Sequence, residues 1–140
     1  MATTAQFVST PIIDISQIAT GNTLRDGNGT FGLVCPGPTF AAGAGVGKRI
    51  TRGVIQATQA TSTGAVRFFA NDQSGNKRLI LEKSIPAITP SATVSGYRTE
   101  VQELVGMVLP GVPAGGTWTS LWASTELGNT FNIMFESGNL

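Results

Sequence analysis

The sequence predicts an all-β protein, an antiparallel two-sheet sandwich that is jelly-roll-like, with about eight or nine strands. Two observations lead to this class. The 140 residues include 18 glycines and 7 prolines, which recur along the whole chain and leave no stretch that favours a helix. Between these turn residues lie short runs rich in Val, Ile, Thr and Phe, the residue types that favour strands.

The strand candidates follow one another along the chain, and each is a β-rich run bounded by turn residues. In the first half they are residues 6–10, 12–18, 31–35 and 49–58. In the second half they are residues 65–70, 78–85, 97–105, 117–124 and 130–136. The stretch 88–96, with its Pro, Ser and Gly, is a predicted loop.

Three local patterns sharpen this assignment. The polar stretch 71–76 between two strand candidates predicts a hairpin loop. Gly27 and Gly29 predict a turn in which both glycines take a positive φ. Near the C-terminus the alternation is strict, so one face of the last strand is expected to carry Phe131, Ile133 and Phe135.

Length and a 41% hydrophobic composition predict one domain spanning residues 1–140. Two interpretations of residues 1–10 stay open. The segment is either an extended N-terminal arm that adds a strand to a neighbour or a frayed terminus. Thr3, Thr4 and Phe7 are its candidate interaction residues.

The charge content is unusual, because only 12% of the residues are charged and the net charge is +1. Soluble domains usually carry about 25%. This balance gives no electrostatic footprint for nucleic acid or an anionic membrane. No apolar run is long enough for a membrane span, and the N-terminus lacks the features of a signal peptide. We therefore expect synthesis in a cytoplasm.

The missing residue types argue against an enzyme. Without histidine there is no Ser-His-Asp triad, no Cys-His dyad and no His-ligated metal. Cys35 is the single cysteine, so neither an intrachain disulfide nor a thiolate zinc site is expected. We expect Cys35 to be a small buried apolar side chain. No cofactor is expected.

Two segments resemble catalytic or ligand motifs only in part. The glycine-rich stretch 42–49 fails as a phosphate loop, because Ala42 replaces the first Gly and Arg49 the hydroxyl residue. A β-like run follows it, where a phosphate loop needs a helix. Glu82 and Glu100 could face each other as a carboxylate pair. The favoured alternative is that such acids are solvated or paired.

Trp118 and Trp122 are expected on the same face of one strand. Three interpretations stay open for them: part of the core, part of a subunit or partner interface, or an aromatic platform for a ligand such as a sugar. They complete the set of candidate interaction residues.

Turn and strand patterns occur in residues 21–30, 65–69, 78–82, 88–91, 109–116, 121–125 and 129–133. Together these segments, which span most of the chain, resemble small virion proteins of tailed bacteriophages and prophages, most similar to capsid decoration, or cement, proteins. No catalytic motif is part of the resemblance.

The resemblance implies a β-sandwich or jelly-roll domain that forms a homotrimer and clamps the major capsid protein on the outer surface of the head. It implies a location in the virion after synthesis in the host cytoplasm. From the charge balance, neither nucleic acid nor a membrane is expected as a partner. The competing expectations are a head-fibre or tail-associated virion protein and a carbohydrate-binding module for receptor recognition.

Overall fold

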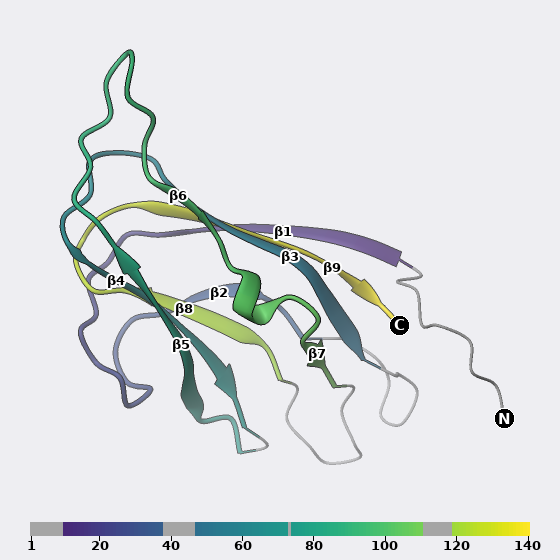
Figure 1. Ribbon diagram of the computed structural model, residues 1–140. Helices are drawn as coiled ribbons and strands as arrows, with labels where there is room; N and C mark the ends of the chain where they lie inside the picture. Colours follow the sequence, from purple (N-terminus) through teal and green to yellow (C-terminus); the bar gives the residue numbers. More distant parts are fainter. Residues whose placement is uncertain (1–9, 38–46, 73, 111–118) are drawn as a thin grey trace, which may run out of the picture.

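The computed structural model describes residues 10–37, 47–72, 74–110 and 119–140, and it is built almost entirely of strands (Figure 1). One short 3-10 helix, η1, covers Gln102–Leu104. The strands are β1 (Thr10–Ile18), β2 (Gly32–Cys35), β3 (Lys48–Ala57), β4 (Gly64–Asn71), β5 (Lys77–Ile85), β6 (Arg98–Glu100), β7 (Val108–Leu109), β8 (Leu121–Thr125) and β9 (Phe131–Asn139).

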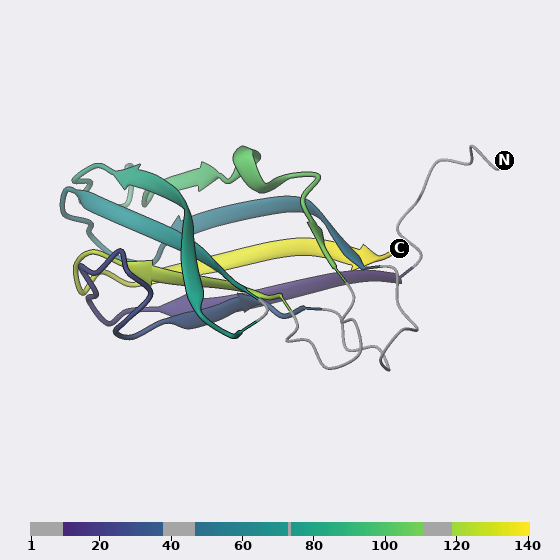
Figure 2. The same cartoon turned by 90° about the horizontal axis from the view of Figure 1, so that it is seen from below.

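The strands form two antiparallel sheets that pack face to face (Figure 2). Sheet A has the order β1-β9-β3-β6, with β7 also paired to β3. Sheet B has the order β2-β8-β4-β5. The antiparallel pairs β1/β9 and β3/β6 lie in sheet A, and the pairs β2/β8 and β4/β5 lie in sheet B. Successive pairs along the chain therefore alternate between the two sheets, which is the jelly-roll arrangement. The predicted fold class is confirmed.

The core lies between the sheets, and strand alternation decides which residues enter it. Phe131, Ile133 and Phe135 of β9 are all buried, as the sequence predicts. The ring of Phe135 meets that of Phe68 from β4 edge to face, with centroids 5.8 Å apart. Because β9 lies between β1 and β3 in sheet A, its buried side chains are next to the buried side chains of both strands.

The stretch 97–105 is the clearest error of the strand assignment. Only Arg98–Glu100 is a strand, and the chain then turns through η1. Val101 and Leu104 are both buried and lie three residues apart, the spacing of one 3-10 turn. In a continuous strand these two side chains would point to opposite faces. The short strand β7 was not predicted.

The first strand also differs from its prediction. The sequence suggests separate runs on either side of Pro11, whereas β1 is continuous through it. A proline fits because β1 is the edge strand of sheet A, where a missing N–H need not break a ladder bond.

The glycine turn after β1 is confirmed. Gly27 and Gly29 have φ of 90° and 94°. The buried Asn22 side chain organises this loop, because its amide donates to the carbonyls of Asn28 and Thr30 at 3.1 and 3.0 Å. The loop is thereby held over sheet B, where the Asn22 N–H also donates to the Thr125 carbonyl.

Candidate functional site

The outer face of β1 carries the most exposed large apolar side chains in the described part of the chain. Ile18 lies in the core. On the same side of the strand, Asp14 accepts a hydrogen bond from Lys48 and Ser16 donates one to the Leu33 carbonyl. The alternate residues Ile13 and Ile15 therefore point away from sheet B, with 60% and 67% of their surface exposed. We call this pair the β1 ridge.

The surroundings of the β1 ridge are mixed, because the apolar Met134 and the charged Glu136, which lies opposite Arg52 of β3, are its neighbours on sheet A. Ile15 lies opposite the half-buried Met134 of β9, and Ile13 lies opposite Glu136. A groove of about 330 Å³ runs beside the ridge and is lined by Pro11, Ile12, Ile13, Thr51, Glu136 and Ser137. The ridge and groove together form a largely apolar surface that continues from β1 over its neighbours.

The one charged residue of β1 is kept inside. The carboxylate of Asp14 accepts a hydrogen bond of 3.4 Å from the Lys48 ammonium. Lys48 is only 4% exposed and also donates to the Pro36 carbonyl at 2.8 Å. Lys48 is thus engaged within the fold, and it begins strand β3 instead of a helix. Both facts agree with the interpretation of residues 42–49 as a loop without phosphate chemistry, although residues 42–46 lie outside the described residues.

Cys35 is close to this pair and is fully buried, as predicted. Burial raises the pKa of its thiol to about 11, although the nearby Lys48 acts in the opposite direction. A thiol with so high a pKa stays protonated at neutral pH and is a poor nucleophile.

Trp122 is on the outer face of sheet B, because its neighbours Leu121 and Ala123 enter the core. Its ring is not a bare platform. The Lys77 ammonium lies 4.4 Å from the ring centre of Trp122 and 5.4 Å from that of Phe31, in cation–π contact. The indole N–H also donates to the Asn71 side-chain oxygen at 3.4 Å. Trp122 is therefore half-buried in a cluster on the outer face of sheet B, and of the three open interpretations the core between the sheets is the one that its position does not fit.

The carboxylates do not form the pair that the sequence left open. Glu82 is on β5 in sheet B and Glu100 is on β6 in sheet A, so the two are not on neighbouring strands. Glu100 pairs with Arg52 at 3.0 Å, and Arg98 lies at 3.6 Å. Hydrogen bonding to Arg52 lowers the pKa of Glu100.

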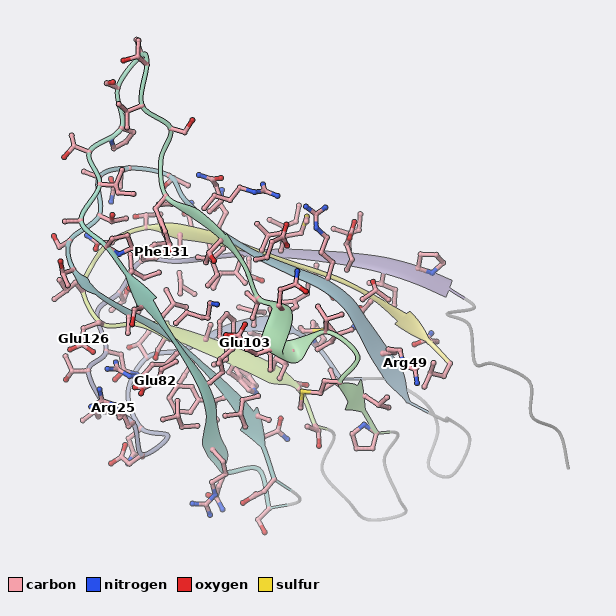
Figure 3. All side chains as sticks on the ribbon, in the orientation of Figure 1. Arg25, Arg49, Glu82, Glu103, Glu126 and Phe131 are labelled. Carbon is pink, nitrogen blue, oxygen red and sulfur yellow. The ribbon has the colours of Figure 1, made fainter. Side chains whose placement is uncertain are left out.

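Glu82 takes part in a larger ion cluster on the outer face of sheet B (Figure 3). It accepts hydrogen bonds from Arg67 at 2.7 Å and from Arg25 at 2.6 Å, and both lower its pKa. Arg67 is also paired with Glu126. A general acid in a hydrolase needs a raised pKa, whereas each carboxyl with a resolved shift among the described residues has a lowered one.

Within residues 10–37, 47–72, 74–110 and 119–140, no group of three or more His, Cys, Asp or Glu side chains is placed to hold a metal ion. The same described residues contain no helix with the length and hydropathy needed to cross a membrane.

Of the candidate residues from the sequence, Thr3, Thr4, Phe7 and Trp118 lie outside the described residues, and Trp122 alone is placed. Ile13 and Ile15 were not among the candidate residues predicted from the sequence. Their signal was present, because Ile12, Ile13 and Ile15 put apolar side chains on both faces of one strand. A second apolar face on an outer strand is typical of contact with another chain.

Comparisons with known proteins add no relative, since no family model, no curated protein and no solved structure matches the chain.

Proposed function

We propose that the protein is a virion structural protein of a tailed bacteriophage, a decoration or cement protein that binds the outer surface of the capsid. In this proposal the chain forms a homotrimer, and each trimer contacts neighbouring copies of the major capsid protein. In this proposal residues 1–9, which precede β1, serve as the N-terminal arm.

The observation that carries the proposal is the β1 ridge. Ile13 and Ile15 are more than half exposed, lie on one face and adjoin an apolar groove. A large exposed apolar patch on a soluble domain marks a contact with another macromolecule. The low charge content supports the same conclusion, since charged residues are depleted in the centres of protein interfaces.

The fold is consistent with this role, because jelly rolls occur among viral capsid domains. That support is an analogy, since lectins and enzymes of the cupin type use the same architecture. A sugar-binding role is less favoured, because Lys77 occupies a position over the ring of Trp122 that a stacked sugar would need.

The mechanism requires binding and no chemistry. A protein that binds the assembled lattice and not the free subunit stabilises the lattice by mass action, by about 2.7 kcal/mol per site at a concentration 100 times Kd. Many copies on one head add their modest contacts, and linkage within an oligomer increases the avidity further.

The test uses heads of the parent phage that lack this protein. We expect the purified full chain to sediment with intact heads, to raise their temperature of heat disruption and not to bind the unassembled major capsid protein. Purified tails serve as the comparison particle. Binding to tails alone would assign the chain to the tail, and binding to neither particle would refute a virion role.

A further inference from the structure

We propose that the free edge of β1 accepts an extended strand contributed by residues 1–9 of a second copy of this chain. The inference rests on the homotrimer of the proposed function and assigns its contact: each copy donates its N-terminal segment to the β1 edge of the next. The edges of the two sheets, the composition of residues 1–9 and the direction in which the chain enters β1 all favour this contact.

Three of the outer strands in the described part of the chain carry features that discourage strand addition. β2 has four residues, and the Ser16 hydroxyl donates to its Leu33 carbonyl at 2.8 Å. β6 has three residues, with charges at Arg98 and Glu100. β5 is long, but it holds five charged or hydroxyl side chains and its register with β4 shifts between Phe68 and Phe69.

β1 shares the Ser16 contact with β2, but it is longer than β2 and β6 and more regular than β5. It has nine residues, and its register with β9 runs without a shift from Thr10↔Asn139 to Ile18↔Phe131. Its outer face presents the β1 ridge, and its single charge, Asp14, turns inward to Lys48. Pro11 removes one N–H, close to the start of the strand. A long, regular and apolar edge is a template for another strand.

Residues 1–9 suit this edge by composition and length, although they lie outside the described residues. Their sequence, Met-Ala-Thr-Thr-Ala-Gln-Phe-Val-Ser, has no charged side chain and no proline. Thr3, Thr4, Phe7 and Val8 are of the residue types that favour strands. Fully extended, nine residues span about 30 Å, which equals the length of a nine-residue strand at about 3.3 Å per residue.

The donor must be another copy because the segment continues directly into β1. To pair with its own β1, the chain would have to reverse in a tight turn next to Thr10. Two-residue hairpin turns depend on Gly, Asn or Asp, and residues 5–11 contain none of them. Donation from each copy to the next is a head-to-tail contact, which closes into a ring when the rotation allows.

The experiment measures mass in solution and amide hydrogen exchange of the full chain. We expect the unaltered protein to form an oligomer in which those amides of residues 12–18 that do not donate to β9 exchange at least about tenfold more slowly at high than at low protein concentration. Ile15→Lys alters the acceptor, and the double variant Thr4→Pro/Gln6→Pro alters the donor. Each should give one-copy mass and fast exchange of these β1 amides.

Ile80→Lys is the matched control, because Ile80 is an exposed isoleucine (41%) on the opposite outer strand, β5. It should leave the oligomer intact. The proposal is overturned if the unaltered chain has one-copy mass, if the oligomer survives either edge or donor change, or if β1 protection is independent of concentration. The last result would mean that each segment folds onto its own chain.

Sedimentation with heads separates this inference from the proposed function. If heads bind the protein while its mass in solution stays that of one copy, decoration stands and strand exchange between copies is wrong. If the oligomer depends on Ile15 but no head binds it, strand exchange stands and decoration is wrong. Protection of β1 that arises on heads alone would identify a capsid segment as the occupant and overturn the inference.

Discussion

Arg67 is a charged residue in a position where an unpaired charge would be costly. It is 2% exposed, and the acids that neutralise it, Glu82 and Glu126, come from β5 and from the turn after β8. Glu82 also forms an ion pair with Arg25, which lies in the loop before β2. The Arg67 guanidinium therefore links β4 to β5 and to the turn after β8, and Glu82 connects the loop before β2 to the same cluster.

We expect Arg67→Ala to lower the free energy of unfolding by about 3 kcal/mol, because it removes a buried ion-pair partner and the packing of its side chain. Urea denaturation would measure the change. Arg78→Ala is the control, since Arg78 is largely exposed in its contact with Asp72 and such pairs contribute at most about 1 kcal/mol. Equal losses in the two variants would contradict this role for Arg67.

At the scale of an element, β3 depends on a residue without a side chain. Gly53 lies opposite Phe135 of β9, and a Cβ placed on it would come within 2.7 Å of the Phe135 ring and 3.1 Å of Val101. Its carbonyl accepts a 2.8 Å hydrogen bond from the Val101 N–H. The glycine thus lets the aromatic ring and the residue preceding η1 pack directly on the strand.

Gly53→Ala should therefore destabilise the fold by about 1–3 kcal/mol, the usual effect of adding volume to a packed core. Thermal unfolding followed by circular dichroism would show the loss. Gly128→Ala is a suitable control, because the nearest atom to its added Cβ is the Ala19 carbonyl oxygen at 3.6 Å, an ordinary contact. Equal losses of thermal stability in Gly53→Ala and Gly128→Ala would contradict the tight packing around Gly53.

For the whole molecule, the titratable groups set a characteristic dependence of stability on pH. The chain has no histidine, the side chain that usually titrates between pH 5 and 8. On the acid side, hydrogen bonds from arginines lower the pKa values of Glu82 and Glu100. Their stabilisation is present above the ordinary carboxyl pKa and is lost as the pH falls through the lowered folded-state value.

On the alkaline side the raised pKa of Cys35 acts in the opposite direction. Its thiol has a pKa of about 11 in the fold against an ordinary 9.0, so the unfolded chain releases this proton first. The stabilisation is complete below about pH 9 and is lost between about pH 9 and 11, by about 2–3 kcal/mol. We expect a flat profile near neutral pH that declines at both ends.

Urea denaturation at pH 7, 9, 10 and 11 would test the alkaline decline in the unaltered protein and in Cys35→Ala. The variant should lose less stability over this interval, because the thiol no longer contributes, while every other group is the same in both proteins. Parallel profiles would show that the Cys35 thiol has no part in the alkaline loss.

Much of the fold could be predicted from the sequence because its signals are local. Turn residues bounded most strands correctly, the polar stretch 71–76 marked the turn between β4 and β5, and alternation in β9 identified the buried face of Phe131, Ile133 and Phe135. Gly27 and Gly29 marked a turn that only glycine adopts easily. Each of these signals is complete within a few neighbouring residues.

The site depended on contacts between distant parts of the chain. Pairing of β1 with β9 joins residues as far apart as Thr10 and Asn139, and it leaves β1 at an edge with Ile13 and Ile15 facing outward. The covering of Trp122 by Lys77 and the separation of Glu82 from Glu100 also follow from strand order. Alternation within a strand determines which residues share a face, but only the assembled sheets decide whether that face meets the core, a neighbour or water.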